Sequence, residues 1–176
     1  MDDDVNGQAP IDENESRGLL LRVRTQEALN RAEEENIVRA RHWSARSRVV
    51  RRDLLNDSTL RRIHKEMFGG VWRWAGTYRQ SDKNVGVPWH QIPVLVRQLC
   101  ENLAVRSTQR TEDRDHLAVD FHHQLVSIHP FANGNGRHAR FCADRLVENF
   151  GGVASPKARS EQPAVGRGAS RGFRKR

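Results

Sequence analysis

The chain is constrained most by one nine-residue run, His129-Pro130-Phe131-Ala132-Asn133-Gly134-Asn135-Gly136-Arg137. Apolar residues recur at helical spacing on both sides of the run: Leu117, Phe121, Leu125 and Ile128 before it, and Phe141, Ala143, Leu146, Val147 and Phe150 after it. Glycines allow successive backbone N–H groups to point one way, and a helix that follows adds its positive N-terminal end. The run therefore predicts a helix, a turn suited to a polyphosphate, and a second helix.

Three further helices are expected upstream of this run. Apolar spacing predicts one over residues 25–44, a second that starts with Asp57 and Ser58 as cap, and a third over residues 92–103. We interpret Trp72 and Trp74, which follow the second helix, as core or rim aromatics. Residues 79–89 carry turn formers and isolated valines, which predicts a short extended hairpin.

The central run, extended to Arg140, resembles the signature of the Fic family, H-x-F-x-[D/E]-G-N-G-R-x-x-R. Seven of its specified positions match: His129, Phe131, Gly134, Asn135, Gly136, Arg137 and Arg140. The departure is Asn133, where the family usually has an acid. The form of the run is most similar to the mobile mystery protein B subfamily. The resemblance covers roughly residues 19–152, most of the chain.

The resemblance implies a protein adenylyltransferase, which transfers AMP from ATP to a Ser, Thr or Tyr hydroxyl of a target protein. His129 would be the general base, because imidazole has an unperturbed pKa of about 6.5. Gly134, Asn135 and Gly136 would hold the phosphates, and Arg137 would bind the β- and γ-phosphates. Arg140 would support the γ-phosphate or an internal carboxylate.

The resemblance also implies an all-α, Fic-like helical bundle with a small β-hairpin flap. The flap residues would pair with the backbone of the target as an added strand: Ser81, Asp82, Lys83, Asn84, Val85, Gly86 and Val87.

Two positions fit the family pattern less well. Asn133 stands where the family places a magnesium ligand, and an amide oxygen brings no charge to a hard divalent cation. Mg²⁺ is still expected, and three outcomes of this replacement stay open: weaker metal binding, recruitment of another acid, or a different phosphate chemistry. Many members also carry an inhibitory [S/T]-x-x-x-E-[G/N] helix. Glu35 and Asn36 fit its last two positions, although Arg31 replaces the Ser or Thr, and Glu33 and Glu34 compete for the role.

Bulk composition allows one domain of this kind and little else. The chain has 176 residues and a net charge of +8, which is unevenly distributed. Residues 1–17 are acidic and residues 153–176 are basic, and both segments are expected to be disordered around a domain at residues 18–152. No apolar run is long enough to span a membrane and the start is acidic, which favours a cytoplasmic protein with free thiols at Cys100 and Cys142.

Other functions stay open at this stage. A relative of the death-on-curing type would transfer the γ-phosphate as a kinase, although Gly136 favours AMP transfer. A non-catalytic partner-binding or nucleic-acid-binding protein would explain Asn133 and the basic tail. The subfamily resemblance implies an association with mobile elements, a toxin–antitoxin setting, and an antitoxin or DNA-binding companion protein. A transition-metal site among His116, His122, His123 and His138 is disfavoured, because their spacing matches no recognised ligand set.

Overall fold

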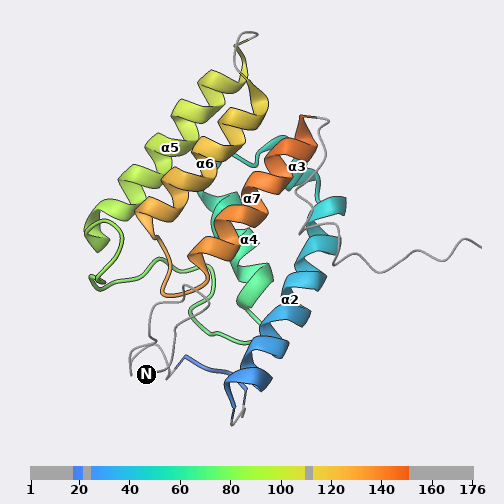
Figure 1. The fold of residues 1–176 in the computed structure, drawn as a ribbon, viewed down its shortest axis with the longest axis vertical. Coiled ribbons are helices and arrows are strands. Elements are labelled where there is room, and N and C mark those ends of the chain that lie inside the picture. Colours follow the sequence, from blue (N-terminus) through green and yellow to red (C-terminus); the bar gives the residue numbers. More distant parts are fainter. Residues whose placement is uncertain (1–17, 22–24, 110–112, 151–176) are drawn as a thin grey trace, which may run out of the picture.

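The computed structural model describes residues 18–21, 25–109 and 113–150, and these form an α-helical fold (Figure 1). The helices are α2 (Gln26–Arg46), α3 (Arg48–Arg52), α4 (Asp57–Phe68), α5 (Ile92–Ser107), α6 (Arg114–Ile128) and α7 (Asn135–Asn149). A 3₁₀ turn, η1 (Trp89–Gln91), leads directly into α5. The all-α class expected from the sequence is confirmed. The expectations for residues 1–17 and 153–176 concern segments that lie outside the described residues.

Side-chain caps fix where the helices begin. The hydroxyl of Thr25 accepts a hydrogen bond from the Ala28 N–H at 3.2 Å, so α2 begins where the sequence predicted. At α4 the cap is Asn56, whose side chain accepts from the Ser58 N–H at 2.9 Å. That cap lies one residue earlier than expected, because the Asn56 backbone is extended while Asp57 is already helical.

α4 lies at the centre of the bundle. It packs against α2, α5 and α7, while α6 packs between α5 and α7, as Figure 1 shows. The largest side chains that are almost fully buried belong to the centre of this arrangement: Leu60, Ile63, Met67, Phe68, Trp72, Ile92, Leu103, Leu117, Phe121, Leu125 and Phe131. Since α6 and α7 enter this core from opposite sides of the nine-residue run, the core fixes the position of the turn between them.

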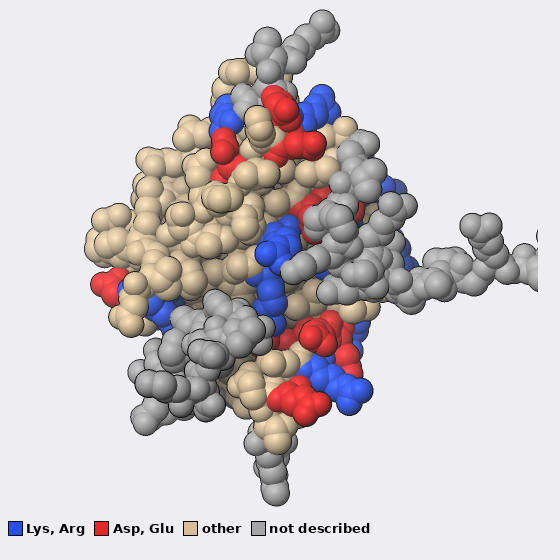
Figure 2. Space-filling model, viewed as in Figure 1, with Lys and Arg blue, Asp and Glu red and all other residues tan. Residues whose placement is uncertain are grey.

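The surface is unevenly charged. On the face seen in Figure 2, uncharged residues cover most of the area over α5 and α6. Exposed apolar residues of these helices are Val94, Val105 and Val119. Charged side chains gather at the top of that face, along its middle and over the lower part of α2. No helix among the described residues is both long enough and apolar enough to cross a membrane.

The two tryptophans belong to the packed interior, as expected. Trp72 is 2% exposed and stacks on Trp74 with ring centroids 5.0 Å apart. The backbone beside Trp72 pairs with the segment before α2: the Leu20 N–H donates to the Val71 carbonyl and the Arg73 N–H donates to the Gly18 carbonyl, both at 2.8 Å. This pairing brings the turn after α4 against the start of the described chain.

The flap segment does not form the β-hairpin that was expected. Residues 79–88 contain no strand and follow a series of bends, which we call the flap loop. Its hydrogen-bonding groups have partners other than a facing strand: the Arg79 N–H donates to the Pro130 carbonyl at 3.0 Å and the Val87 N–H donates to the Ile128 carbonyl at 3.3 Å. The flap loop is therefore attached to the end of α6 and the start of the central run, and its two halves do not pair with each other.

Candidate functional site

The central run forms a turn between α6 and α7, and we call residues 129–134 the motif loop. Helix α6 ends at Ile128, and His129 follows in the left-handed conformation, with φ 54° and ψ 59°. Helix α7 begins at Asn135 after Gly134, which also has a positive φ of 76°. No side chain caps α7, so its positive N-terminal end opens onto the motif loop. The predicted arrangement of helix, turn and helix is confirmed.

Asn135 braces the motif loop from inside. Its side-chain oxygen accepts from the Phe131 N–H at 2.8 Å, and its amide nitrogen donates to the Phe131 carbonyl at 2.9 Å. Asn135 is 3% exposed, so this amide serves the loop and does not face a ligand. Of the three residues predicted to hold phosphates, Asn135 therefore offers its backbone and not its side chain.

A buried histidine of α4 holds the same loop from below. The ring of His64 stacks on Phe131 with centroids 3.7 Å apart. The Gly76 N–H donates to His64 Nδ1 at 3.0 Å, so Nε2 carries the proton and donates to the Asn133 carbonyl at 3.1 Å. Burial lowers the pKa of His64 well below its usual value, which keeps the ring in this neutral form.

Gly134 can be no other residue without strain. Its φ of 76° suits glycine, and a Cβ there would lie 2.6 Å from the Phe68 ring. We expect Gly134→Ala to destabilise the fold by about 1–2 kcal/mol through its backbone and by about 1–3 kcal/mol more through overpacking.

Urea unfolding measures this loss, with Gly136→Ala as the matched control. A Cβ at Gly136 would meet nothing within 4 Å, so its stability is expected to stay the same or rise slightly. Equal stability of the two variants would contradict the claim that the backbone conformation and the Phe68 contact require glycine at position 134.

Arg137 is held by one carboxylate and is only partly satisfied. Its Nη1 lies 2.6 Å from Oε2 of Glu33 on α2, and its guanidinium lies over the Phe68 ring, 4.9 Å from the centroid. Trp72 Nε1 donates to the other Glu33 oxygen at 2.5 Å. Nη2 of Arg137 is buried and has no hydrogen-bond partner within the described part of the chain. A buried, unpaired donor on a cation beside a helix N-terminus fits an anionic ligand.

The carboxylate that contacts the motif differs from the one expected. Glu35 is exposed, and no ion pair joins it to Arg140, although both residues lie in described segments. Glu33 is 3% exposed and contacts the first motif arginine. The sequence did carry a signal: Glu33 lies four residues after Leu29 and four before Ile37, on the apolar face of α2. Glu35 lies about 200° further around the helix.

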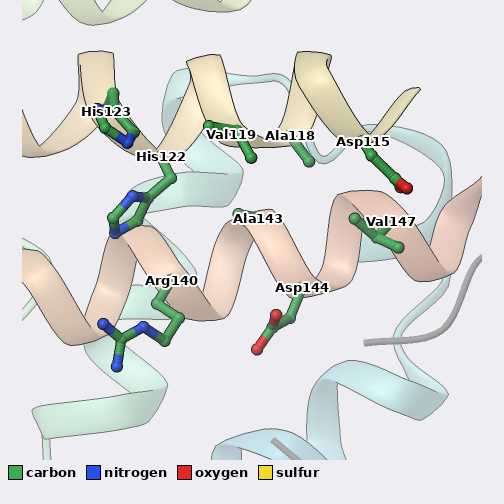
Figure 3. A pocket seen from close by; sticks show the side chains of 9 residues that line it. All are labelled: Asp115, Ala118, Val119, His122, His123, Arg140, Ala143, Asp144 and Val147. Atoms are coloured by element: carbon green, nitrogen blue, oxygen red, sulfur yellow. The ribbon is translucent and has the colours of Figure 1, made fainter. Parts of the chain in front are cut away.

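Arg140 lines a shallow groove between α6 and α7 of about 370 Å³. Figure 3 shows Arg140 and Asp144 extending from α7 on one side, with His122 and His123 on α6. Ala118, Val119, Ala143 and Val147 line the space between these polar groups. Burial, and then the charges of His123 and Arg140, lower the pKa of His122. Among the described residues no group of His, Cys, Asp and Glu has metal-site geometry.

Asn133 is turned inward. It is 8% exposed, and its side-chain oxygen accepts from the Gly134 N–H at 2.5 Å while its carbonyl accepts from His64. The motif loop thus presents one amide oxygen that is already engaged, and no carboxylate. These donors do not fit a Mg²⁺ site of the protein's own, since such sites use carboxylates and demand near-octahedral geometry.

His129 is a half-buried, neutral imidazole beside the flap loop. Burial lowers its pKa most, followed by the charges of Arg79 and Lys83. The ring is therefore unprotonated near neutral pH and competent to accept a proton. The motif loop and the start of α7 together supply a proton acceptor, a helix N-terminus and a partly satisfied arginine, a combination suited to chemistry on a phosphate ester.

Known proteins share this sequence pattern and fold. Protein adenylyltransferase VbhT of Bartonella schoenbuchensis is 30% identical over 99 residues, which is 52% of this chain and 21% of that protein. A Sinorhizobium fredii protein named "Probable protein adenylyltransferase y4lH" is 33% identical over 85 residues, 44% of each chain. The chain thus spans less than half the length of these two relatives.

Solved structures share the fold at lower identity. The N-terminal FIC domain of Bep8 from Bartonella sp. 1-1C superposes with a TM-score of 0.63 at 18% identity, over 76% of this chain and 71% of that one. The BepC protein of Bartonella tribocorum, with bound AMPPNP, gives 0.56 at 19% identity, over 72% and 70%. The model of the Fic/DOC family matches residues 54–147, more than half of the chain, and this protein is therefore a member of the Fic/DOC family.

Proposed function

We propose that this chain is a protein adenylyltransferase that moves AMP from ATP to a hydroxyl side chain of a target protein. The observation that carries the proposal is the partly satisfied guanidinium of Arg137 beside the uncapped start of α7, one short loop away from the neutral imidazole of His129. The two curated relatives are named as adenylyltransferases, and the BepC structure holds an ATP analogue. These names support ATP as the substrate here.

These groups support the following proposed chemistry. The hydroxyl oxygen attacks the α-phosphorus of ATP, His129 accepts the hydroxyl proton, and the bond to the leaving pyrophosphate breaks. The developing charge lies on the β- and γ-phosphates, and Nη2 of Arg137 is the unpaired donor suited to them. Gly134 and Gly136 leave the backbone without side chains at this point, and Arg140, one turn further on α7, is proposed to serve the γ-phosphate.

The flap residues Ser81 to Val87 are proposed to dock the target. Val85 at the loop surface is 44% exposed, and Arg79 and Lys83 bring positive charge to the same segment. Target backbone would meet an irregular edge here, because the loop forms no strand.

A cytoplasmic setting, an antitoxin or DNA-binding companion and the mobile-element subfamily remain predictions from the sequence.

Labelled ATP tests the proposal. The purified protein is incubated with cell lysate, Mg²⁺ and ATP labelled at either the α- or the γ-phosphate. We expect protein-bound label from α-labelled ATP only. Label from γ-labelled ATP only would make the chain a kinase of the death-on-curing type, and no transfer at all would favour the non-catalytic alternative.

Asn133 gives a separate prediction. An aspartate there keeps an acceptor for the Gly134 N–H and adds a charge suited to Mg²⁺. Asn133→Asp is therefore expected to lower the Mg²⁺ concentration for half-maximal AMP transfer by about tenfold. The measurement is a Mg²⁺ titration at fixed ATP, and identical titration curves for the two proteins would show that position 133 is no ligand.

A further inference from the structure

One buried side chain joins the flap loop to the motif loop. The side chain of Arg79 is 1% exposed, and its Nε donates to the His129 carbonyl at 2.8 Å. Its Nη1 donates to the Ser81 carbonyl at 2.7 Å, and its Nη2 donates to the Val87 carbonyl. A single guanidinium thus bonds both ends of the flap loop and the backbone of the proposed general base.

The backbone carbonyls of three consecutive residues at the end of α6 and the start of the motif loop accept hydrogen bonds from the flap loop. The Ile128 carbonyl accepts from the Val87 N–H, the His129 carbonyl from Arg79 Nε, and the Pro130 carbonyl from the Arg79 N–H. Two of these three bonds come from Arg79. Because these carbonyls lie at the C-terminal end of α6, the positive guanidinium also complements the helix dipole there.

The backbone that Arg79 holds is a strained one. His129, with φ 54°, is the one non-glycine residue with positive φ in the described segments. Such a conformation costs free energy and persists when the surrounding structure fixes it. The hydrogen bond from Arg79 Nε to the His129 carbonyl supplies part of that restraint. The left-handed conformation sets the direction of this carbonyl, and the hydrogen bond holds it there.

The flap loop also touches the His129 side chain. Gly86 has φ 91°, and a Cβ there would lie 2.5 Å from the His129 Cβ and 2.9 Å from Arg79 Nη2. The charged groups that act on the imidazole are Arg79 and Lys83 of the flap loop, and the Val126 carbonyl of α6 acts in the opposite sense. The flap loop therefore sets both the position and the surroundings of the ring.

We propose that Arg79 is a positioning residue, which locks the flap loop and the backbone of His129 into one unit so that a docked target hydroxyl meets the imidazole. This rests on the proposed function. The ion pair with Asp82 is long, at 3.9 Å from Nη1, and Asp82 is largely exposed, so this pair contributes little. The bonds from Arg79 to carbonyls join the two loops. Lysine keeps the charge but cannot reach several carbonyls at once.

The test compares Arg79→Lys with Arg73→Lys, an exposed arginine six residues earlier that serves as the matched control. We expect Arg79→Lys to lower the rate of AMP transfer at saturating ATP by about a hundredfold, because small misplacements of a base are costly. The Kd for ATP is expected to stay within about twofold, since Arg137 lies on α7. Arg73→Lys is expected to behave as wild type. An unchanged transfer rate in Arg79→Lys would overturn the proposal.

A second readout needs no enzymatic activity. Amide hydrogen exchange at Val87 is expected to rise at least about tenfold in Arg79→Lys while α5 stays protected, and the NMR titration of the His129 ring is expected to shift. Unchanged exchange and titration would overturn the proposal even if wild type shows no AMP transfer. If Arg79→Lys does not fold, Gly86→Ala replaces it: its Cβ pushes the flap loop off His129 with Arg79 intact, and the same losses are expected.

Discussion

His129→Ala is expected to lower AMP transfer by at least about a hundredfold, the usual contribution of a general base. The imidazole is half-buried and held neutral by burial and by the charges of Arg79 and Lys83, so it can accept a proton near neutral pH. The contacts proposed for the phosphates come from α7, and the Kd for ATP is therefore expected to stay nearly unchanged. Transfer from α-labelled ATP and calorimetric ATP binding measure the two effects.

His123→Ala is the matched control for this variant. His123 is an exposed histidine of α6, the helix that ends just before His129, and lies six residues before it. It is expected to retain the wild-type transfer rate. If His129→Ala kept full activity, or if both variants lost activity equally, the role of His129 as general base would be refuted.

Glu33→Gln is expected to tighten ATP binding by about tenfold and to raise the transfer rate. The Glu33 carboxylate occupies Nη1 of Arg137, so phosphates have to compete with it. Hydrogen bonds to charged groups are worth about 1.5–3 kcal/mol, enough for a change of this size. Glutamine keeps an oxygen for Trp72 Nε1 and turns its NH₂ group, which accepts nothing, toward Arg137.

Glu35→Gln separates this effect from a general loss of negative charge on α2. Glu35 is exposed on the same helix and is not paired with Arg140. The ATP affinity of Glu35→Gln is therefore expected to equal that of wild type. Thermal unfolding checks that both variants are folded. Equal ATP affinity of Glu33→Gln and wild type would show that the Glu33–Arg137 pair does not restrict the site.

Much of the fold could be predicted because its signals are local. Apolar spacing and polar caps act within a few residues, and they placed α2 at Thr25 and α4 within one residue of its start. The glycines of the central run likewise predicted the turn before α7, and Gly134 has the positive φ that such a turn requires. The short helix α3 was not predicted, because five residues carry too little periodicity.

The parts that sequence reasoning missed depend on contacts distant in the chain. The flap loop forms no hairpin because the Arg79 and Val87 N–H groups donate to the distant Pro130 and Ile128 carbonyls, and Arg79 Nε donates to the His129 carbonyl 50 positions away. The contact of Glu33 with Arg137 spans 104 positions, and the bond from Trp72 that orients Glu33 spans 39. Glu33 competes with Glu35 for this role in the sequence pattern, and its place on the apolar helix face is the signal that distinguishes the two.

The proposed function depends most directly on whether AMP transfer requires His129 once the Glu33–Arg137 ion pair is removed. The decisive measurement is protein labelling from α-labelled and γ-labelled ATP by Glu33→Gln and by the double variant Glu33→Gln/His129→Ala. We predict strong labelling from α-labelled ATP by the single variant and a loss of at least about a hundredfold in the double variant. Equal labelling by the two proteins, or label that comes from γ-labelled ATP alone, would contradict the account.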